Sequence, residues 1–304
     1  MLRCTFLLQD SHPLVRRHAL LLLSQLLLQD YLKWRGLLLF RFLATLADPD
    51  AAVAQLSRFT LTNPLLAKTP TIFVNNFVET IFVLNNYSEH PTCAAAAAAS
   101  AEEADGSVRR RMGIYNTLLE HMSDEHKIQV TAKLAHDILA AAVDGQLPVI
   151  ADNDDHHTRA KAENVLRDAF VVLSCPGIKV GGGRGGGGSQ SQGGSQSQGG
   201  ADVSSGGAGV AAASVAAART RLLSKMSRKH LIENVVPVVV SLKAVLERGH
   251  SPLLRELMGY LRELFRHYAD EVKEVLSADP TLAHELAFDL KRYDKEEAAR
   301  RRRA

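Results

Sequence analysis

Apolar residues recur along this chain at intervals of three and four, the spacing that places them on one face of an α-helix. The N-terminal half carries this pattern over residues 14–28, 33–46, 51–61, 71–84, 109–122 and 124–143. The C-terminal half carries it over residues 159–173, 235–246, 254–268 and 282–299. Residues 71–84 also contain β-branched and aromatic side chains and permit a strand, but strand-like alternation is otherwise nearly absent. We therefore expect an all-α protein.

The segment 10–28 joins a short turn to the first predicted helix. Pro13 suits the first helical turn, and the small Ala19 permits a neighbouring helix to approach closely. The side chains expected on the buried face are Leu14, Val15, Leu22 and Leu26. Val15 and Val53 stand 38 residues apart, near the ~40–47 residues of a HEAT or armadillo repeat. We predict a HEAT/armadillo-type α-solenoid, interrupted by a disordered Gly/Ser/Gln-rich linker.

Composition divides the chain into four parts. Residues 1–147 are expected to form the solenoid, and residues 148–176 a short acidic loop and a helix. Residues 177–210 are predicted to be a disordered linker, because 15 of the 21 glycines lie there and the rest is mostly Ser, Gln and Ala. Residues 211–304 are expected to form terminal helical repeats that end in a basic run.

The charge is uneven along the chain. Residues 1–180 carry 17 Lys and Arg against 19 Asp and Glu, whereas residues 211–304 carry 18 against 13. The three cysteines form no CxxC pair, which argues against a disulfide framework or a structural zinc site. The sequence shows no signal-peptide core and no apolar run of the ~20 residues that a membrane helix needs. We expect a soluble protein in a reducing, intracellular compartment, without a membrane partner.

Three patterns partly match known metal or phosphate sites but lack the residue spacing that those sites require. Asp152, Asp154 and Glu163 match parts of a calcium loop, but His157 replaces the glycine of its sharp turn. The adjacent pair His156 and His157 has no second ligand cluster in register. The glycine run matches a phosphate loop only by its low complexity. We expect no enzyme, no cofactor and no small-molecule substrate, and an enzyme with an unrecognised site remains a rival hypothesis without support.

Basic side chains are the remaining candidates for binding, as contacts to DNA phosphates. These are Arg16, Arg17, Lys33, Arg35, Arg41, Arg109, Arg110, Arg111, Arg300, Arg301, Arg302 and Arg303. Arg16 has an alternative, structural role, in which it binds an aspartate of a neighbouring repeat. The run that ends at Arg303 is equally compatible with a solvated helix end or a nuclear-localisation signal.

Several short runs together resemble the C-terminal HEAT region of the D-type regulatory subunit of condensin, in its condensin II version. They are HPLVRR (12–17), YLKWRG (31–36), FRF (40–42), FVETIF (77–82), NNY (85–87), RMGIY (111–115), LLEHMSDE (118–125), IENVVP (232–237), SLK (241–243) and RELM (255–258). The resemblance covers residues 10–147 and 219–292. It departs from the family in lacking upstream repeats and a long C-terminal tail, and in its polyalanine and Gly/Ser/Gln insertions.

The resemblance implies a non-catalytic scaffold subunit that acts in mitotic chromosome condensation, in the nucleus and on chromosomes. Its implied partners are the SMC ATPase subunits, the kleisin subunit, a second HEAT subunit and DNA or chromatin. The rival hypothesis is a HEAT adaptor in another pathway, such as nuclear transport or signalling, with no role at DNA. If the first repeat is an internal one, an apolar surface should remain exposed at the N-terminal end.

Overall fold

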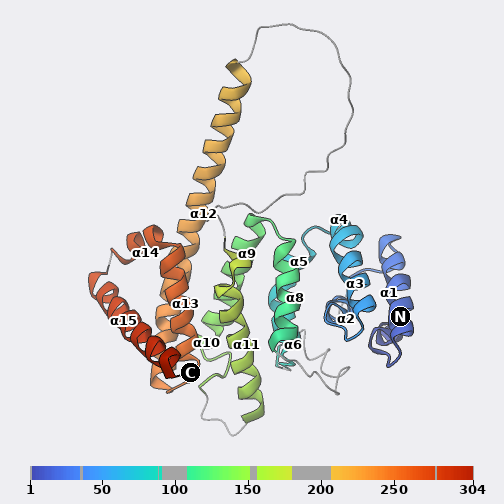
Figure 1. Cartoon of the computed structure of the whole chain (residues 1–304), viewed down its shortest axis with the longest axis horizontal. Coiled ribbons are helices and arrows are strands. Elements are labelled where there is room, and N and C mark those ends of the chain that lie inside the picture. The colour runs from blue at the N-terminus through green and yellow to red at the C-terminus, as the bar shows by residue number, and fades with distance from the viewer. Residues whose placement is uncertain are drawn as a thin grey trace.

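The computed structural model describes residues 2–34, 37–87, 89–90, 108–150, 156–179, 207–277 and 279–303. Every regular element in these ranges is a helix, which confirms the all-α prediction. The helices stand side by side in a row from α1 (Pro13–Leu28) at one end to α15 (Pro280–Arg303) at the other, as a solenoid requires (Figure 1).

The N-terminal end contains the 3-10 helix Leu2–Gln9, α1, α2 (Leu38–Thr45) and α3 (Ala51–Thr60). Pro13 opens α1, as predicted, and the side chain of Asp50 caps α3 by accepting the N–H groups of Ala52 and Val53, each at 3.0 Å. Helix α2 is shorter than the predicted helix over residues 33–46. These local signals fix where the first helices begin.

The buried face of α1 differs from the prediction. Its buried apolar residues are Ala19, Leu20, Leu23 and Leu27. Leu14 and Leu22 are instead 55% and 56% exposed, and Val15 is also exposed. The reason is that α1 packs on the 3-10 helix and α3 with one face, while no described helix covers the other. An apolar surface is therefore exposed at this end, as expected for an internal repeat.

The central part is made of short helices joined with few breaks. A π-helical turn, Leu61–Leu65, accommodates Pro64 and connects α3 to α4 (Leu66–Lys68). Residues 71–84 form α5 (Ile72–Asn75) and α6 (Phe77–Leu84), so the strand alternative is wrong. Then follow α8 (Val108–Glu120), α9 (Asp124–Leu134), the π-helix Ala135–Ala140, α10 (Ala141–Val143) and α11 (His156–Ser174).

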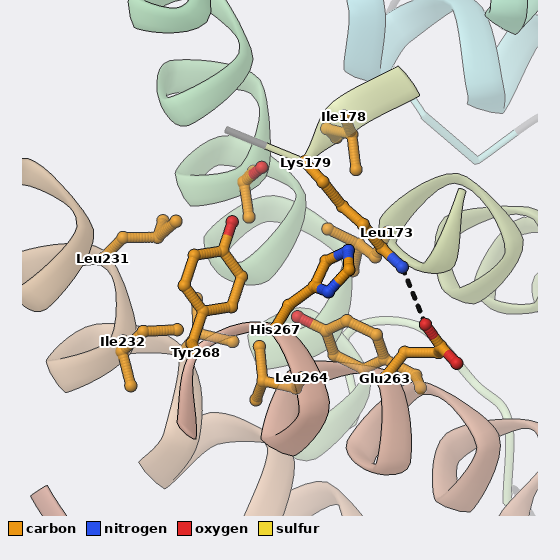
Figure 2. Close-up of a pocket in the computed structure, with 12 residues that line it drawn as sticks. Leu173, Ile178, Lys179, Leu231, Ile232, Glu263, Leu264, His267 and Tyr268 are labelled. Carbon is orange, nitrogen blue, oxygen red and sulfur yellow. Dashed lines mark hydrogen bonds and ion pairs between the residues drawn. The ribbon is translucent and has the colours of Figure 1, made fainter. Parts of the chain in front are cut away.

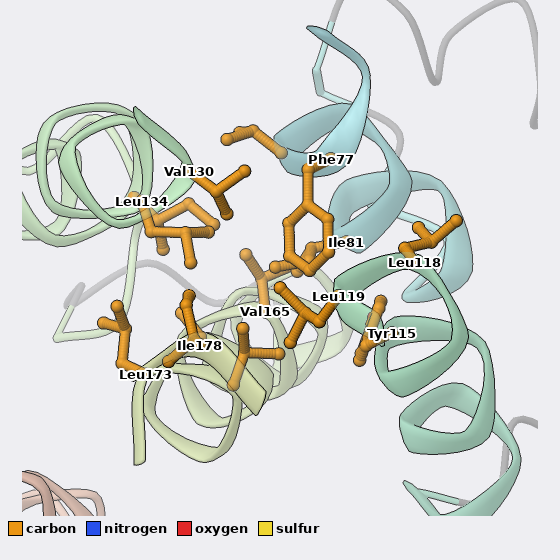
Figure 3. Close-up of a cluster of buried hydrophobic side chains, with 14 of the residues drawn as sticks. Phe77, Ile81, Tyr115, Leu118, Leu119, Val130, Leu134, Val165, Leu173 and Ile178 are labelled. Atoms are coloured by element: carbon orange, nitrogen blue, oxygen red, sulfur yellow. The ribbon is translucent and has the colours of Figure 1, made fainter. Parts of the chain in front are cut away.

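The central core lies where α6, α8, α9 and α11 meet (Figure 3). Phe77 and Ile81 of α6 point toward Leu119 of α8 and Val165 of α11 in this view. All of these side chains are fully buried. Burial of such large apolar side chains contributes about 1.5–3 kcal/mol each.

The C-terminal part begins with the 42-residue helix α12 (Gly207–Arg248), followed by α13 (Leu254–His267), α14 (Ala269–Leu276) and α15. The N-terminal portion of α12 extends beyond the row of helices (Figure 1). The predicted linker boundaries differ here, because residues 207–210 are helical and Pro176–Ile178 is a 3-10 helix. Residues 180–206 of the predicted linker and the polyalanine run lie outside the described residues.

Candidate interaction surfaces

Arg16 joins two repeats and lies inside the solenoid. Its Nε and Nη2 donate to the two carboxylate oxygens of Asp48 at 2.8 and 2.7 Å, and its Nη1 donates to the carbonyl oxygens of Asp10 and Ser11. The hydrogen bond to Asp48 raises the pKa of the guanidinium. Arg16 thus has the alternative, structural role that the sequence left open.

Arg41 is also buried. Its Nη1 donates to the hydroxyl of Thr5, and the guanidinium carbon lies 3.9 Å from the ring centroid of Phe6. Burial lowers the pKa of this guanidinium. Arg41 therefore fastens α2 to the N-terminal 3-10 helix, and its guanidinium contacts protein groups there.

Arg111 lies at the centre of a buried polar network. Its Nε and Nη2 donate to the carboxylate of Asp168 at 2.6 and 3.0 Å. The same carboxylate accepts the hydroxyl of Tyr115 and the side-chain amide of Asn85, both at 2.9 Å. Burial is the main reason that the pKa of Tyr115 lies well above its ordinary value. The network ties α6, α8 and α11 together.

Sequence reasoning missed Asp168, although a signal was present. This acidic residue stands on the apolar face of α11, between Val165 and Ala169, and its side chain is completely buried. A carboxylate at such a position requires a cationic or hydrogen-bonding partner. The partner itself was not readable, because it lies 57 positions away in the sequence.

The exposed members of the predicted set do not form one cluster. Arg17 and Lys33 lie at the N-terminal end, and Lys33 is 3.5 Å from the carboxylate of Asp30. Arg109 and Arg110 are exposed on the first turn of α8, in the middle of the row (Figure 1). Arg35 lies outside the described residues. A ligand that contacts both the N-terminal pair and the pair on α8 must therefore extend along the solenoid.

The C-terminal arginines lie on the last turns of α15. Arg300, Arg301 and Arg302 are exposed on the last turns of α15, and Arg303 is the final residue of that helix. Cations at this position are favoured by the helix dipole. The C-terminal end of α15 lies beside α12 and α13, and the central helices separate it from α1, which carries Arg17 (Figure 1).

A small pocket lies between the end of α11 and helices α12 and α13 (Figure 2). Lys179 donates to the carboxylate of Glu263 at 2.7 Å, and the ring of His267 lies beside them. The hydrogen bond from Lys179 lowers the pKa of Glu263. The space is about 20 Å³, which is room for about one water molecule. The pocket is too small for an organic substrate.

The described ranges contain no group of three or more His, Cys, Asp or Glu side chains placed to hold a metal ion. Asp152 and Asp154 of the rejected calcium pattern lie outside those ranges. Within the same part of the chain, no helix has both the length and the apolar content needed to cross a bilayer.

Comparison with known proteins identifies the family. A model of condensin-2 complex subunit D3-like HEAT repeats matches residues 191–303, and a model of the non-SMC mitotic condensation complex subunit 1 matches residues 5–151. The chain is 35% identical over 297 residues to condensin-2 complex subunit D3-L of Xenopus laevis, which is 95% of this chain and 18% of that protein. This chain belongs to the condensin-2 D3 family. The resemblance noted in the sequence is thereby confirmed, as is the HEAT solenoid.

Other D3 proteins agree. Condensin-2 complex subunit D3 of Mus musculus is 34% identical over 295 residues, covering 95% of this chain and 18% of the mouse protein. Condensin-2 complex subunit CAP-D3 of Arabidopsis thaliana is 36% identical over 301 residues, covering 96% of this chain and 21% of the plant protein. The chain thus spans about a fifth of the length of these D3 relatives. No solved structure matches it significantly.

Proposed function

We propose that this chain acts as part of a non-catalytic HEAT-repeat regulatory subunit of condensin II, a scaffold for mitotic chromosome condensation in the nucleus and on chromosomes. The observation that carries the proposal is similarity to D3 subunits from a frog, a mouse and a plant over almost the whole chain. The chain spans only part of those proteins, so we also propose that it shares in the activity of the complete subunit.

A scaffold must hold its surfaces in a fixed relation, and the inter-helix ion pairs serve this purpose. Arg16 with Asp48 connects α1 to the turn before α3, and Arg111 with Asp168 connects α8 to α11. Both pairs are largely buried and bidentate, a geometry that specifies how helices are oriented. Stacked helices held in this way present extended outer surfaces to partners.

The partners that we propose are the SMC ATPase subunits, the kleisin subunit and a second HEAT subunit. ATP hydrolysis would belong to the SMC subunits, and this chain would need no cofactor and no small-molecule substrate. The small size of the pocket beside Lys179 is in keeping with a binding role.

DNA or chromatin is the further proposed partner. The exposed side chains that we propose for phosphate contacts are Arg17, Lys33, Arg109, Arg110, Arg300, Arg301 and Arg302. We leave out Arg16, Arg41 and Arg111, because their guanidinium groups are buried against Asp48, Phe6 and Asp168. Arg35 and Arg303 stay candidates on their sequence alone.

The direct test is affinity capture of the tagged chain from mitotic cells, followed by mass spectrometry. We expect SMC and kleisin subunits of condensin II in the capture. Asp168→Asn is the matched control, because it removes the buried carboxylate charge beneath an unchanged outer surface and should reduce capture only through unfolding. Recovery of none of these subunits with the folded, unsubstituted chain would refute the proposal.

DNA binding needs its own test with a labelled duplex. If about four of these side chains contact phosphates, the affinity for the duplex should fall about 100-fold between about 50 and 200 mM salt. Charge reversal at Arg17 and Lys33 should weaken binding, whereas reversal at the exposed acidic residue Glu120 should not. An affinity that does not change with salt would exclude phosphate-based contact.

A further inference from the structure

Three acidic residues of α15 form ion pairs with the helices on which it packs. On the packed face, Asp289 lies 2.7 Å from Lys243 of α12. Two further acids of α15 pair with α13, Asp294 with Arg262 at 3.3 Å and Glu297 with Arg255 at 2.6 Å. These three carboxylates are thus engaged by the neighbouring helices, whereas Glu285 and Glu296 of α15 are exposed.

The opposite face of α15 carries two lysines and a histidine around an aromatic ring, with the exposed Glu285 and Glu296 at its margins. His284, Phe288, Lys291 and Lys295 follow one another at intervals of four, three and four residues, which places them on one side of the helix. All four side chains are exposed, and Phe288 is 62% exposed. Among the described residues, neither Lys291 nor Lys295 forms an ion pair. We name these four residues the α15 outer face.

The packed side holds this face in place. Leu286 of α15 is almost completely buried, and α15 packs on both α13 and α14. The three ion pairs to Lys243, Arg262 and Arg255 add charge-assisted contacts along the helix. A ligand that binds the outer face would therefore meet a surface that is already ordered, which reduces the entropy lost on binding.

We propose that the α15 outer face is a docking surface for an acidic protein segment that carries an apolar side chain. Carboxylates of the segment would pair with Lys291 and Lys295, and its apolar side chain would cover the ring of Phe288. Aromatic side chains at the centre of a contact, surrounded by polar groups, are the usual anchors of protein–protein interfaces. The proposal goes beyond condensin membership and does not depend on DNA binding.

The exposed ring is what favours a protein over a nucleic acid. Contacts to the phosphates of a duplex gain from lysines but not from a phenylalanine between them. From His284 to Lys295 the face is ~16 Å long on the helical rise of 1.5 Å per residue. That length accommodates three turns of a helix, or about five residues of an extended segment.

The experiment uses the full chain and a labelled peptide of about 16 residues, made of Glu and Asp with Leu at every fourth position. Binding is measured by fluorescence anisotropy beside two matched probes, the same peptide with Gln in place of Leu and a DNA duplex. The variants are Phe288→Gln and the pair Lys291→Glu with Lys295→Glu. The controls are Phe59→Gln, a 63% exposed phenylalanine on α3, and Arg17→Glu on α1.

We expect the Leu-containing peptide to bind and each α15 variant to weaken it at least about tenfold, while the two control variants leave it unchanged. Thermal melts should be unaltered, because the substituted side chains are exposed. The proposal fails if the peptide does not bind at about 100 μM. It also fails if Phe288→Gln has no effect, or if the Gln peptide or the duplex binds as tightly as the Leu peptide.

Discussion

The carboxylate of Asp168 accepts hydrogen bonds from two nitrogens of Arg111, although 57 positions separate these residues in the sequence. Asp168 is completely buried, and Tyr115 and Asn85 donate to the same carboxylate. Such a network depends on all of its members, because removal of one charge leaves the other buried without compensation.

Asp168→Asn should therefore lower the free energy of unfolding by about 3–5 kcal/mol. The amide keeps the shape of the carboxylate but leaves the Arg111 charge unpaired. Denaturant unfolding followed by circular dichroism measures the change. The double variant Asp168→Leu, Arg111→Met should recover only part of the loss, because Tyr115 and Asn85 lose their acceptor. A single variant as stable as the parent would show that the buried pair contributes little.

Gly249 follows the end of α12 at a point where the backbone passes close to the segment before α11. A Cβ atom at this position would lie 2.5 Å from Cγ2 of Ile150. Gly249→Ala should lower the free energy of unfolding by about 1–3 kcal/mol, because Ile150 must move. Gly113 on α8 is the matched control, since nothing lies within 4 Å of its added Cβ. There, Ala should stabilise the helix by about 0.5–1 kcal/mol, and equal melting shifts for both variants would contradict the argument.

His267 gives the stability a dependence on pH. Partial burial, followed by the charges of Lys179 and Arg266, lowers the pKa of its imidazole below the ordinary 6.5. The folded state therefore binds fewer protons, so this contribution is complete above about pH 6.5 and is lost as the pH falls through the folded pKa. Melting temperatures between about pH 7 and 5 should fall, and His267→Asn should flatten that fall. An unchanged slope in the variant would assign the effect to other groups.

Glu263 acts at lower pH. Its pKa is also lowered, chiefly by the hydrogen bond from Lys179, so its contribution is present above the ordinary value of 4.5 and disappears only below it. The two groups can thus be separated by the pH at which each loss occurs.

The exposed apolar face of α1 predicts self-association. Leu14 and Leu22 lie on this face, and burial of both against a second molecule would remove apolar surface from water. Leu14→Glu with Leu22→Glu should reduce the weight-average mass in sedimentation at high concentration without lowering the melting temperature. The matched variant Leu20→Glu, at a fully buried position of the same helix, should unfold the first repeat.

Helix starts were readable from the sequence where the signal is local. Pro13 stands in the first turn of α1, as predicted, and a second local signal is the hydroxyl of Ser123, which accepts the N–H of His126 at the start of α9. The bounds of α12 were not predicted from local signals. This helix continues through Pro237 and begins earlier than the composition suggested.

The wrong face of α1 has a different cause. This helix is apolar on two sides, and its own sequence cannot show which side a neighbour covers. The burial of Arg41 and Arg111 was hidden for the same reason, since Thr5 and Asp168 are distant in sequence. The candidate residues Arg17 and Arg300 could be listed from the sequence, but the separation of α1 from the end of α15 by the central helices could not be predicted.

The length of α12 has a consequence for cooperativity. Most helices of the row contact only their neighbours, so local unfolding at one end need not spread to the other. Helices α11 and α12 both connect the central part to the C-terminal part, because α11 contacts α13 and α12 contacts α9, α10, α13 and α14. We expect hydrogen exchange to show α9 to α14 opening as one unit, with α1 to α3 exchanging separately and sooner.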